Sequence, residues 1–347
     1  EGDGMMTVEE KNKLKEEINK AIHLIDDESY RYDILNEGNS FERFYNFATE
    51  DMRGYYHEFG KPRTFLTVSA SGDQILNAVK LGAERIDAFD LNRLSKRQCS
   101  QKVSAASVLT PDDLYNYFNT FKEEMFTSFS DRLKEEDRIF WSTLFDFNGE
   151  SEFSKLYPYK KLSKEMVCRI NPYLDEDGYS EFQKRLADVE INYIDSNIYD
   201  LERYLGDNTY DGMTFSNIYE YLNYGRNVSH ENALRYYEFI MKQMYPRLND
   251  NGTIMVTYMY AFSDKVRDYV KEMVAEGDLD KLVYSGRLAI DQLDLYLRGM
   301  TSQNYSYVLL LDLFEKENIK KVATTRVEFG QSFDDAHDMA LCLKKTK

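Results

Sequence analysis

The sequence has few cysteines and no long apolar run. Its three cysteines, Cys99, Cys168 and Cys342, are far apart and odd in number. They form neither a disulfide framework nor a paired metal motif, and they fit a reducing compartment. No apolar run reaches the ~18 residues of a membrane-spanning helix, and the polar N-terminal stretch lacks the apolar core of a signal peptide. These absences predict a cytoplasmic protein without a transmembrane segment.

Basic residues are also scarce relative to acidic ones. Lysine and arginine total 44 against 61 aspartates and glutamates, which gives a formal net charge of −17 and an isoelectric point of about 4.8. Nucleic-acid binding depends on cations set against phosphates, so this balance disfavours nucleic acids and anionic membranes as partners. One lysine cluster stands out and is typical of a solvated face; it comprises Lys155, Lys160, Lys161 and Lys164.

The chain does have enough apolar material for a large core. Its 347 residues are 42% hydrophobic and 30% charged, which favours one large or two modest globular domains over disorder. Tyrosine is abundant, with 28 residues beside the single Trp141. A tyrosine joins an apolar ring to a polar tip and therefore suits clefts and interfaces. The composition does not indicate an oligomeric state.

The first 60 residues have helical patterns. Thr7 and Glu10 have the spacing of a capping box, and apolar residues follow every three or four positions, so we predict a helix near 8–25. A run rich in aromatic residues predicts a second helix near 40–59, ended by Pro62. We therefore expect an N-terminal helical cap, residues 1–60.

The pattern then changes to strand and helix in alternation. Residues 64–68 are a short β-rich run that ends in small residues, and residues 73–81 are helix-like with Gly82 as a stop signal. Residues 85–89 form another short strand pattern that ends at Asp90, and a further helix pattern continues to about residue 108. This order predicts a βαβ unit with parallel strands.

The rest of the chain first interrupts this alternation and then resumes it. Residues 110–185 are rich in aromatic and charged residues and predict a helical insertion that acts as a lid or acceptor region. Further elements are predicted after it: strands at 189–194, 210–215 and 253–260, a helix at 229–248, a turn at 249–252, and two last strands at 305–314 and near 337–344.

The residues at the strand ends predict a ligand site. In a doubly wound sheet, ligands bind outside the carboxyl ends of the strands. The small residues 69–72 let a ligand approach the backbone, and the N–H groups that open the next helix can hold an anionic group. Asp90 lies 17 residues after Asp73, close to the spacing of about 20 at which an acid meets ribose hydroxyls. Asp195 ends the next strand and is placed to accept a hydrogen bond from an adenine amino group.

The loop also separates cofactor classes. It contains one glycine, Gly72, and does not have the G-x-G-x-x-G pattern that a pyrophosphate-bearing dinucleotide requires, which disfavours NAD and FAD. An ordinary α/β turn, with Asp90 and Asp195 as solvated caps, is an equally valid interpretation of the pattern alone.

The run from Thr64 to Val108, with its strand ending in Ser-Gly-Asp and its second strand ending in Asp-Leu-Asn, resembles the betaine-lipid synthase A-type family. This resemblance implies a Rossmann-like class I methyltransferase fold, a mostly parallel sheet flanked by helices with a terminal antiparallel strand. It implies a catalytic domain over residues 61–347 and S-adenosylmethionine as cofactor. Characterised members of the family transfer the 3-amino-3-carboxypropyl group to a lipid hydroxyl, so the acceptor would be a small molecule or a lipid headgroup.

The resemblance also implies roles for individual residues. Cofactor-binding positions would be Ser69, Ala70, Ser71, Gly72 and Asp73 at the methionine end, Asp90, Leu91 and Asn92 at the ribose, Asp195 and Ser196 at the adenine, and Ser216 and Asn217 after the fourth strand. Tyr219 and Tyr221 are the catalytic candidates on the acceptor side, with Glu220 and His230 as further possibilities; each can equally be a packing or surface residue. The other histidines, His23, His57 and His337, do not cluster, and no metal-ligand spacing is present.

Three functions therefore remain open. The first is an S-adenosylmethionine-dependent transferase that moves an aminocarboxypropyl or a methyl group. The second is a non-catalytic Rossmann-like binding or scaffold protein, which predicts no cofactor affinity. The third, a nicotinamide-dependent oxidoreductase, is disfavoured by the glycine-poor loop.

Overall fold

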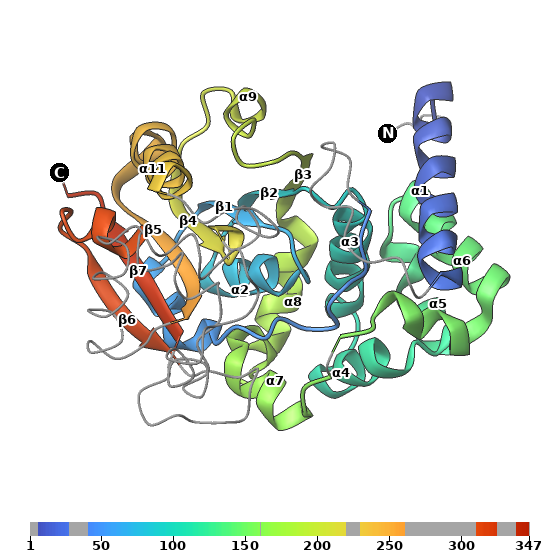
Figure 1. Cartoon of the computed structure of the whole chain (residues 1–347). Coiled ribbons are helices and arrows are strands. Elements are labelled where there is room, and N and C mark those ends of the chain that lie inside the picture. Colours follow the sequence, from blue (N-terminus) through green and yellow to red (C-terminus); the bar gives the residue numbers. More distant parts are fainter. Residues whose placement is uncertain are drawn as a thin grey trace, which may run out of the picture. The chain divides into compact units, whose positions relative to one another are not determined.

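In the part of the chain that the computed structural model describes, seven strands form one mostly parallel sheet, in the order β3-β2-β1-β4-β5-β7-β6 (Figure 1). The described residues are 6–27, 41–159, 161–219, 230–260, 310–324 and 338–346. The order β3-β2-β1-β4-β5 is that of a doubly wound Rossmann sheet. Strand β7 runs antiparallel to both of its neighbours, β5 and β6. This confirms the predicted Rossmann-like class I methyltransferase fold.

The chain divides into two units, and the division passes through strand β1. The first unit contains Glu1–Ala48 and Thr67–Tyr204, and the second contains Thr49–Leu66 and Leu205–Lys347. The first 60 residues are thus shared between the two units at Ala48. Each unit is described by itself below.

The predicted βαβ pattern is present at the expected positions. Strand β1 is Thr64–Val68, helix α2 is Asp73–Leu81, strand β2 is Arg85–Asp90 and helix α3 is Ser95–Ala106. The middle residues of both strands are buried, as expected for a sheet covered on both faces. Helix α2 ends at Gly82, whose φ of 120° is a left-handed cap that a glycine adopts without a Cβ clash.

Strand β3, Glu190–Asp195, pairs in parallel with β2. In this register Asp90 lies opposite Asp195, so the last residues of the two strands are neighbours. The pairing therefore brings two carboxylates from distant parts of the sequence to one edge of the sheet.

The segment predicted as a second helix, 40–59, is mostly not helical. Residues 41–51 contain no helix, and only two short 3-10 helices follow, η1 at Met52–Gly54 and η2 at Tyr56–Phe59. The backbone N–H groups of this segment have tertiary partners instead: Phe44 donates to the carbonyl of Leu156 and Ala48 donates to the carboxylate of Asp73. The aromatic residues that predicted a helix, among them Phe41, Phe44 and Phe47, are buried although the backbone that carries them is not helical.

The region 110–185 is helical, as predicted, and belongs to the first unit. Its helices are α4 (Pro111–Thr120), α5 (Glu123–Phe129), α6 (Glu135–Phe153), α7 (Lys164–Ile170) and α8 (Tyr179–Asp188). Its core is aromatic; the rings of Phe145 and Phe153, for example, stack with centroids 4.5 Å apart.

Helix α1, Val8–Asp26, begins with the predicted capping box between Thr7 and Glu10. It lies beside α6 in the first unit (Figure 1). The buried face of α1 includes Leu14, Ala21 and Leu24, which recur at the spacing of one helical stripe.

The second unit contains the other half of the sheet. Strand β4, Tyr210–Ser216, pairs in parallel with β5, Leu248–Tyr260. The turn predicted at 249–252 is a register shift inside β5, where Asn251 has a φ of 62°. Before β5, helix α11 (His230–Glu238) continues as a π-helical turn, Phe239–Met244. A short helix, α9 (Glu202–Leu205), precedes β4.

The predicted strand 305–314 is wrong over its described part, because residues 310–314 are helical. Glu315 donates its backbone N–H to the carbonyl of Leu311, and the buried residues Leu310, Leu311 and Phe314 have helical spacing. A continuous apolar run rich in leucine does not distinguish helix from strand, and leucine favours helix. Residues 305–309 lie outside the described part.

The strand at this sheet edge is β6, Lys320–Thr324, which the sequence did not predict because its residues are mostly exposed and two are lysines. Strand β7, Asp338–Lys344, confirms the strand predicted near 337–344. None of the described helices is long and apolar enough to cross a membrane.

Candidate functional site

The turn between β1 and α2 is tight and has two residues with left-handed backbone. Ala70 has a φ of 43° and Gly72 a φ of 86°. Ser69 donates its N–H to the carbonyl of Phe89 at 2.8 Å, and Gly72 donates to the carbonyl of Ser69 at 2.8 Å. A Cβ at Gly72 would lie 3.3 Å from a side-chain carbon of Lys102. Glycine therefore suits this position in both conformation and packing.

Asp90 joins this turn to the end of β2. Its carboxylate accepts hydrogen bonds from the backbone N–H of Ala70 and of Asn92, each at 2.9 Å. The residue is half-buried, whereas Ala70 is exposed. Burial raises the pKa of the Asp90 carboxyl; hydrogen bonds from the two N–H groups and from the side chain of Ser95 oppose this rise, and the nearby charge of Asp195 adds to it. A carboxylate held in this way at a strand end can accept hydrogen bonds from a polar ligand.

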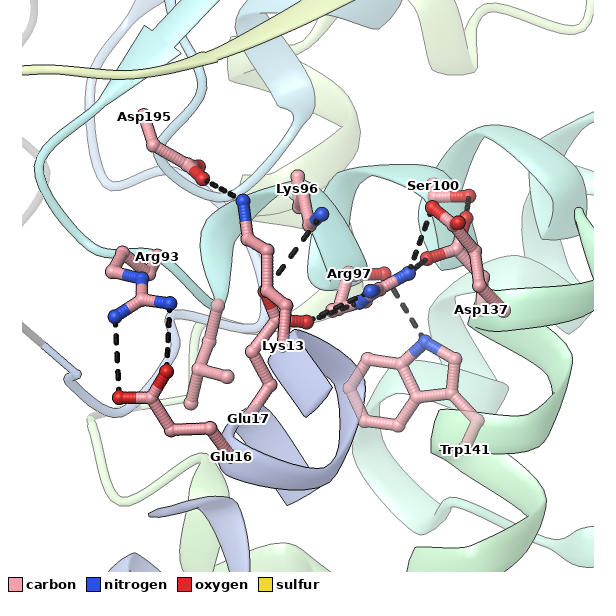
Figure 2. A network of polar contacts seen from close by, with 12 residues as sticks. Lys13, Glu16, Glu17, Arg93, Lys96, Arg97, Ser100, Asp137, Trp141 and Asp195 are labelled. Atoms are coloured by element: carbon pink, nitrogen blue, oxygen red, sulfur yellow. Dashed lines mark hydrogen bonds and ion pairs between the residues drawn. The ribbon is translucent and has the colours of Figure 1, made fainter. Parts of the chain in front are cut away.

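Asp195 and Ser196 follow β3 beside Asp90. The backbone N–H of Ser196 donates to the carbonyl of Asp90 at 3.0 Å, and its hydroxyl donates to the carbonyl of Asn197 at 2.8 Å. The carboxylate of Asp195 accepts a hydrogen bond of 2.7 Å from the ammonium of Lys13, on helix α1 (Figure 2). No local sequence pattern indicates this partner, because 182 positions separate the two residues.

Leu91 and Asn92 complete the β2–α3 turn, and both are half-buried. The side-chain oxygen of Asn92 accepts from the N–H of Glu42 and of Leu94, each at 3.1 Å, and its amide donates to the carbonyl of Glu42 at 3.0 Å. Asn92 thus attaches the segment after residue 40 to this turn.

Asp73 is completely buried, and its carboxylate accepts four hydrogen bonds. Ser71 and the N–H of Ala48 donate to one oxygen, each at 2.6 Å, and Lys102 at 3.0 Å and Tyr173 at 2.7 Å donate to the other. A carboxylate has about four acceptor positions, and four donors fill them. The contacts of Asp73 therefore support a role in positioning the turn and do not support the predicted direct contact with a cofactor.

Lys102 is the central residue of this buried network. Its side chain is inaccessible to solvent, and its ammonium also donates to the carbonyl of Asn46 at 2.6 Å. The ammonium lies 4.3 Å from the ring centre of Phe47 and 5.1 Å from that of Phe118, within cation–π range. Burial lowers the pKa of Lys102, and the charge of Asp73 opposes this change. The sequence did not single out Lys102, because nothing near it in the chain indicates burial.

The remaining predicted residues belong to the second unit. Ser216 and Asn217, at the end of β4, are half-buried; Asn217 has a φ of 50° and donates its N–H to the carbonyl of Thr257 at 3.1 Å. Tyr219 is buried, with its ring centre 5.2 Å from that of Tyr236. This environment favours packing as the role of Tyr219. Three other candidates were predicted: Glu220 and Tyr221 lie outside the described residues, as does the side chain of His230.

A buried carboxyl that the sequence did not select lies at the ends of β4 and β5. Glu50 is 3% exposed and accepts a hydrogen bond of 2.6 Å from the hydroxyl of Ser216. Burial raises the pKa of Glu50 above its usual range; the hydroxyls of Ser216, Thr257 and Tyr55 oppose the rise, and the charge of Asp51 adds to it. Close by, the hydroxyls of Thr49 and Tyr258 are hydrogen-bonded at 2.7 Å, and Tyr258 has a φ of 61°. Left-handed conformations of bulky residues are uncommon and occur often at functional sites.

Replacing Glu50 with glutamine should stabilise the protein at alkaline pH. Because the folded-state pKa of Glu50 is raised, its contribution to stability is present below the unfolded-state pKa of about 4.3 and is lost as the pH rises through the folded-state pKa. We expect Glu50→Gln to raise the melting temperature at about pH 8 and to change it little at about pH 4, as measured by calorimetry. The control is Glu231→Gln, an exposed residue of α11. A lower melting temperature for Glu50→Gln at alkaline pH would contradict this account.

Among the described residues, no group of three or more histidine, cysteine, aspartate or glutamate side chains could hold a metal ion.

No protein-family model matches the sequence, and no curated protein matches it. Solved structures with a similar path of the chain include cofactor-bound Rv0187 from MTB, with 8% identity, 95% of this chain and 90% of that chain covered, and a TM-score of 0.37. The N-methyltransferase NodS from Bradyrhizobium japonicum WM9 has 9% identity and a TM-score of 0.32, and the match covers 85% of this chain and 96% of that chain. The O-methyltransferase from Bacillus cereus in complex with SAH has 8% identity and a TM-score of 0.31, and the match covers 95% of this chain and 91% of that chain. At these values the likeness carries no residue correspondence and no activity to this chain.

Proposed function

We propose that this chain is an S-adenosylmethionine-dependent transferase whose cofactor site lies at the carboxyl ends of β2 and β3. The observation that supports this most directly is the position of Asp90. Its half-buried carboxylate ends β2, joins the exposed turn residue Ala70, and lies opposite Asp195 in the sheet register. Ligands of doubly wound sheets bind at this edge, and an acid at the end of the second strand is suited to a ribose diol.

The residues present fit such a cofactor in their chemistry. Asp90 would accept hydrogen bonds from the ribose hydroxyls, and Asp195 would accept from the adenine amino group. The turn of residues 69–72 would hold the amino-acid end through its backbone, since its small side chains allow close approach. Asp73 would position this turn through the hydrogen bond that its carboxylate accepts from the hydroxyl of Ser71. The cofactor would supply a carbon made electrophilic by an adjacent sulfonium, which is a good leaving group.

The finer proposal is that the group transferred is 3-amino-3-carboxypropyl, as the resemblance over residues 64–108 implies; methyl transfer is the alternative. In either case the protein must align the acceptor and remove its proton. The acceptor would be a small molecule or the hydroxyl of a lipid headgroup.

Within the second unit, taken by itself, Glu50 is our candidate for a proton acceptor. A carboxyl with a raised pKa is suited to general-base catalysis near neutral pH, and Ser216, which is half-buried, can relay a proton to it through their hydrogen bond. An acceptor hydroxyl would give its proton to the Ser216 oxygen while Ser216 gives its own proton to Glu50.

The nucleoside product tests the reaction. The purified protein, incubated with S-adenosylmethionine and fractionated small-molecule and lipid extracts, should release methylthioadenosine if the aminocarboxypropyl group moves and S-adenosylhomocysteine if the methyl group moves. Because S-adenosylmethionine slowly decomposes to methylthioadenosine, the matched control is the Asp90→Ala protein under the same conditions. Equal, background amounts of both products from the two proteins with every fraction would contradict transferase activity.

A further inference from the structure

Helix α1 contacts helices α3 and α6 of the same unit through a buried network of charged side chains (Figure 2). Glu17 is completely buried and accepts from the guanidinium of Arg97 on α3 at 2.8 Å. Arg97 also pairs with Asp137 on α6, and its carbonyl accepts from the indole of Trp141 at 3.1 Å. Breaking a buried pair by removing one partner is strongly unfavourable, so these contacts hold α1 in a fixed position.

Lys13 lies one helical turn before Glu17 and therefore on the same face of α1. From this position its ammonium reaches the carboxylate of Asp195 at 2.7 Å (Figure 2). The side chains of Lys13 and Asp195 are 40% and 28% exposed, whereas those of Glu17 and Arg97 are 0% and 3% exposed. The two ion pairs of this face thus differ in burial: the pair of Glu17 and Arg97 is buried, whereas the pair of Lys13 and Asp195 is partly exposed to solvent and contributes less stability.

The partly exposed pair lies at the nucleoside end of the cofactor site proposed above. In the register of strands β2 and β3, Asp195 lies opposite Asp90, and the N–H of Ser196 donates to the carbonyl of Asp90. Lys13 contacts the carboxylate that would accept from the adenine amino group. Lys13 pairs with the Oδ2 oxygen of Asp195, and its positive charge offsets the negative charge that would strengthen a hydrogen bond from the adenine amino group.

We propose that Lys13 is a side-chain gate of the nucleoside end, and that cofactor binding exchanges the Lys13–Asp195 ion pair for a contact between Asp195 and the ligand. This inference rests on the proposed function. In it, α1 stays fixed by Glu17 and Arg97, and only the long, flexible side chain of Lys13 moves out to solvent. Lys13 thereby lowers cofactor affinity and favours ligands whose base can donate a hydrogen bond to Asp195.

Calorimetric titration with S-adenosylmethionine tests the gate without knowledge of the acceptor. Lys13→Met keeps the length of the side chain and removes its charge. Because a partly exposed ion pair contributes little, we expect this variant to bind about two- to fivefold more tightly than the wild type. The matched control is Lys15→Met, which removes the same charge from an exposed position of α1 and should leave affinity unchanged.

A double-mutant cycle assigns the effect to the pair. In an Asp195→Asn background, which still offers a carbonyl acceptor but no charge, Lys13→Met should no longer tighten binding. Raising the salt concentration should narrow the difference between wild type and Lys13→Met, because salt screens partly exposed pairs. Thermal unfolding of each variant shows whether α1 remains packed.

The outcomes separate the gate from the proposed function. Wild-type binding that is unchanged or weakened by Lys13→Met, in a protein with an intact unfolding transition, would overturn the gate and leave the cofactor site standing. Binding by both proteins, about two- to fivefold tighter for Lys13→Met, would support both the gate and the proposed function. Absence of binding by either folded protein would overturn the proposed function, and the gate with it.

Discussion

Replacing Lys102 with methionine should lower the free energy of unfolding by about 3–5 kcal/mol, the usual cost of breaking a buried ion pair by removing one partner. Lys102 and Asp73 are both inaccessible to solvent, and the ammonium also donates to the carbonyl of Asn46. Methionine would fill a similar volume but would leave the carboxylate of Asp73 without its positive partner. Denaturant titration followed by circular dichroism measures the change.

A surface lysine provides the control for this prediction. Lys184 is 75% exposed and pairs with Glu181 at 3.7 Å, so Lys184→Met should cost at most about 1 kcal/mol. In an Asp73→Asn background the effect of Lys102→Met should be smaller, because the charge it leaves behind is already absent. A loss below about 1 kcal/mol for Lys102→Met in the wild-type background would show that the pair is not buried as described.

Replacing Asp90 with alanine should lower the affinity for S-adenosylmethionine by at least about 100-fold. Each hydrogen bond between a charged carboxylate and a hydroxyl contributes about 1.5–3 kcal/mol, and a ribose diol would make two of them. The substitution also removes the acceptor of the Ala70 and Asn92 N–H groups, which loosens the turn that would hold the amino-acid end of the cofactor. Calorimetric titration measures the loss.

Two checks show whether the loss of affinity is due to the cofactor site and not to unfolding. Burial raises the pKa of Asp90, so its removal should not greatly destabilise the fold, and the unfolding transition should remain cooperative. Asp131→Ala removes an exposed carboxylate from the same unit and should leave cofactor affinity unchanged. An Asp90→Ala protein that binds as tightly as the wild type would exclude Asp90 from the site.

The first βαβ unit could be predicted from the sequence because the residues that begin and end its elements are recognisable from their immediate neighbours. Small residues follow β1, Gly82 ends α2, and Asp90 ends β2. Patterns failed where long-range contacts determine the backbone. The N–H of Ala48 donates to the distant carboxylate of Asp73, and the segment before it is not helical although it is rich in aromatic residues.

The same distinction applies to the candidate site. Asp90 and Asp195 were predictable, since the carboxyl ends of parallel strands meet at one edge of a sheet. Lys13, Glu50 and Lys102 were not, because their partners are 182, 166 and 29 positions away and no local pattern indicates them. Whether an acid such as Asp73 contacts a ligand or the protein also depends on such distant donors.

Titration of the intact protein with S-adenosylmethionine is the most direct test of the central claim. We expect saturable binding in the micromolar range, at one site per chain, and an affinity at least about 100-fold lower for Asp90→Ala. No measurable binding by a protein that shows a cooperative thermal transition would contradict this claim and would favour a non-catalytic binding or scaffold role for this fold.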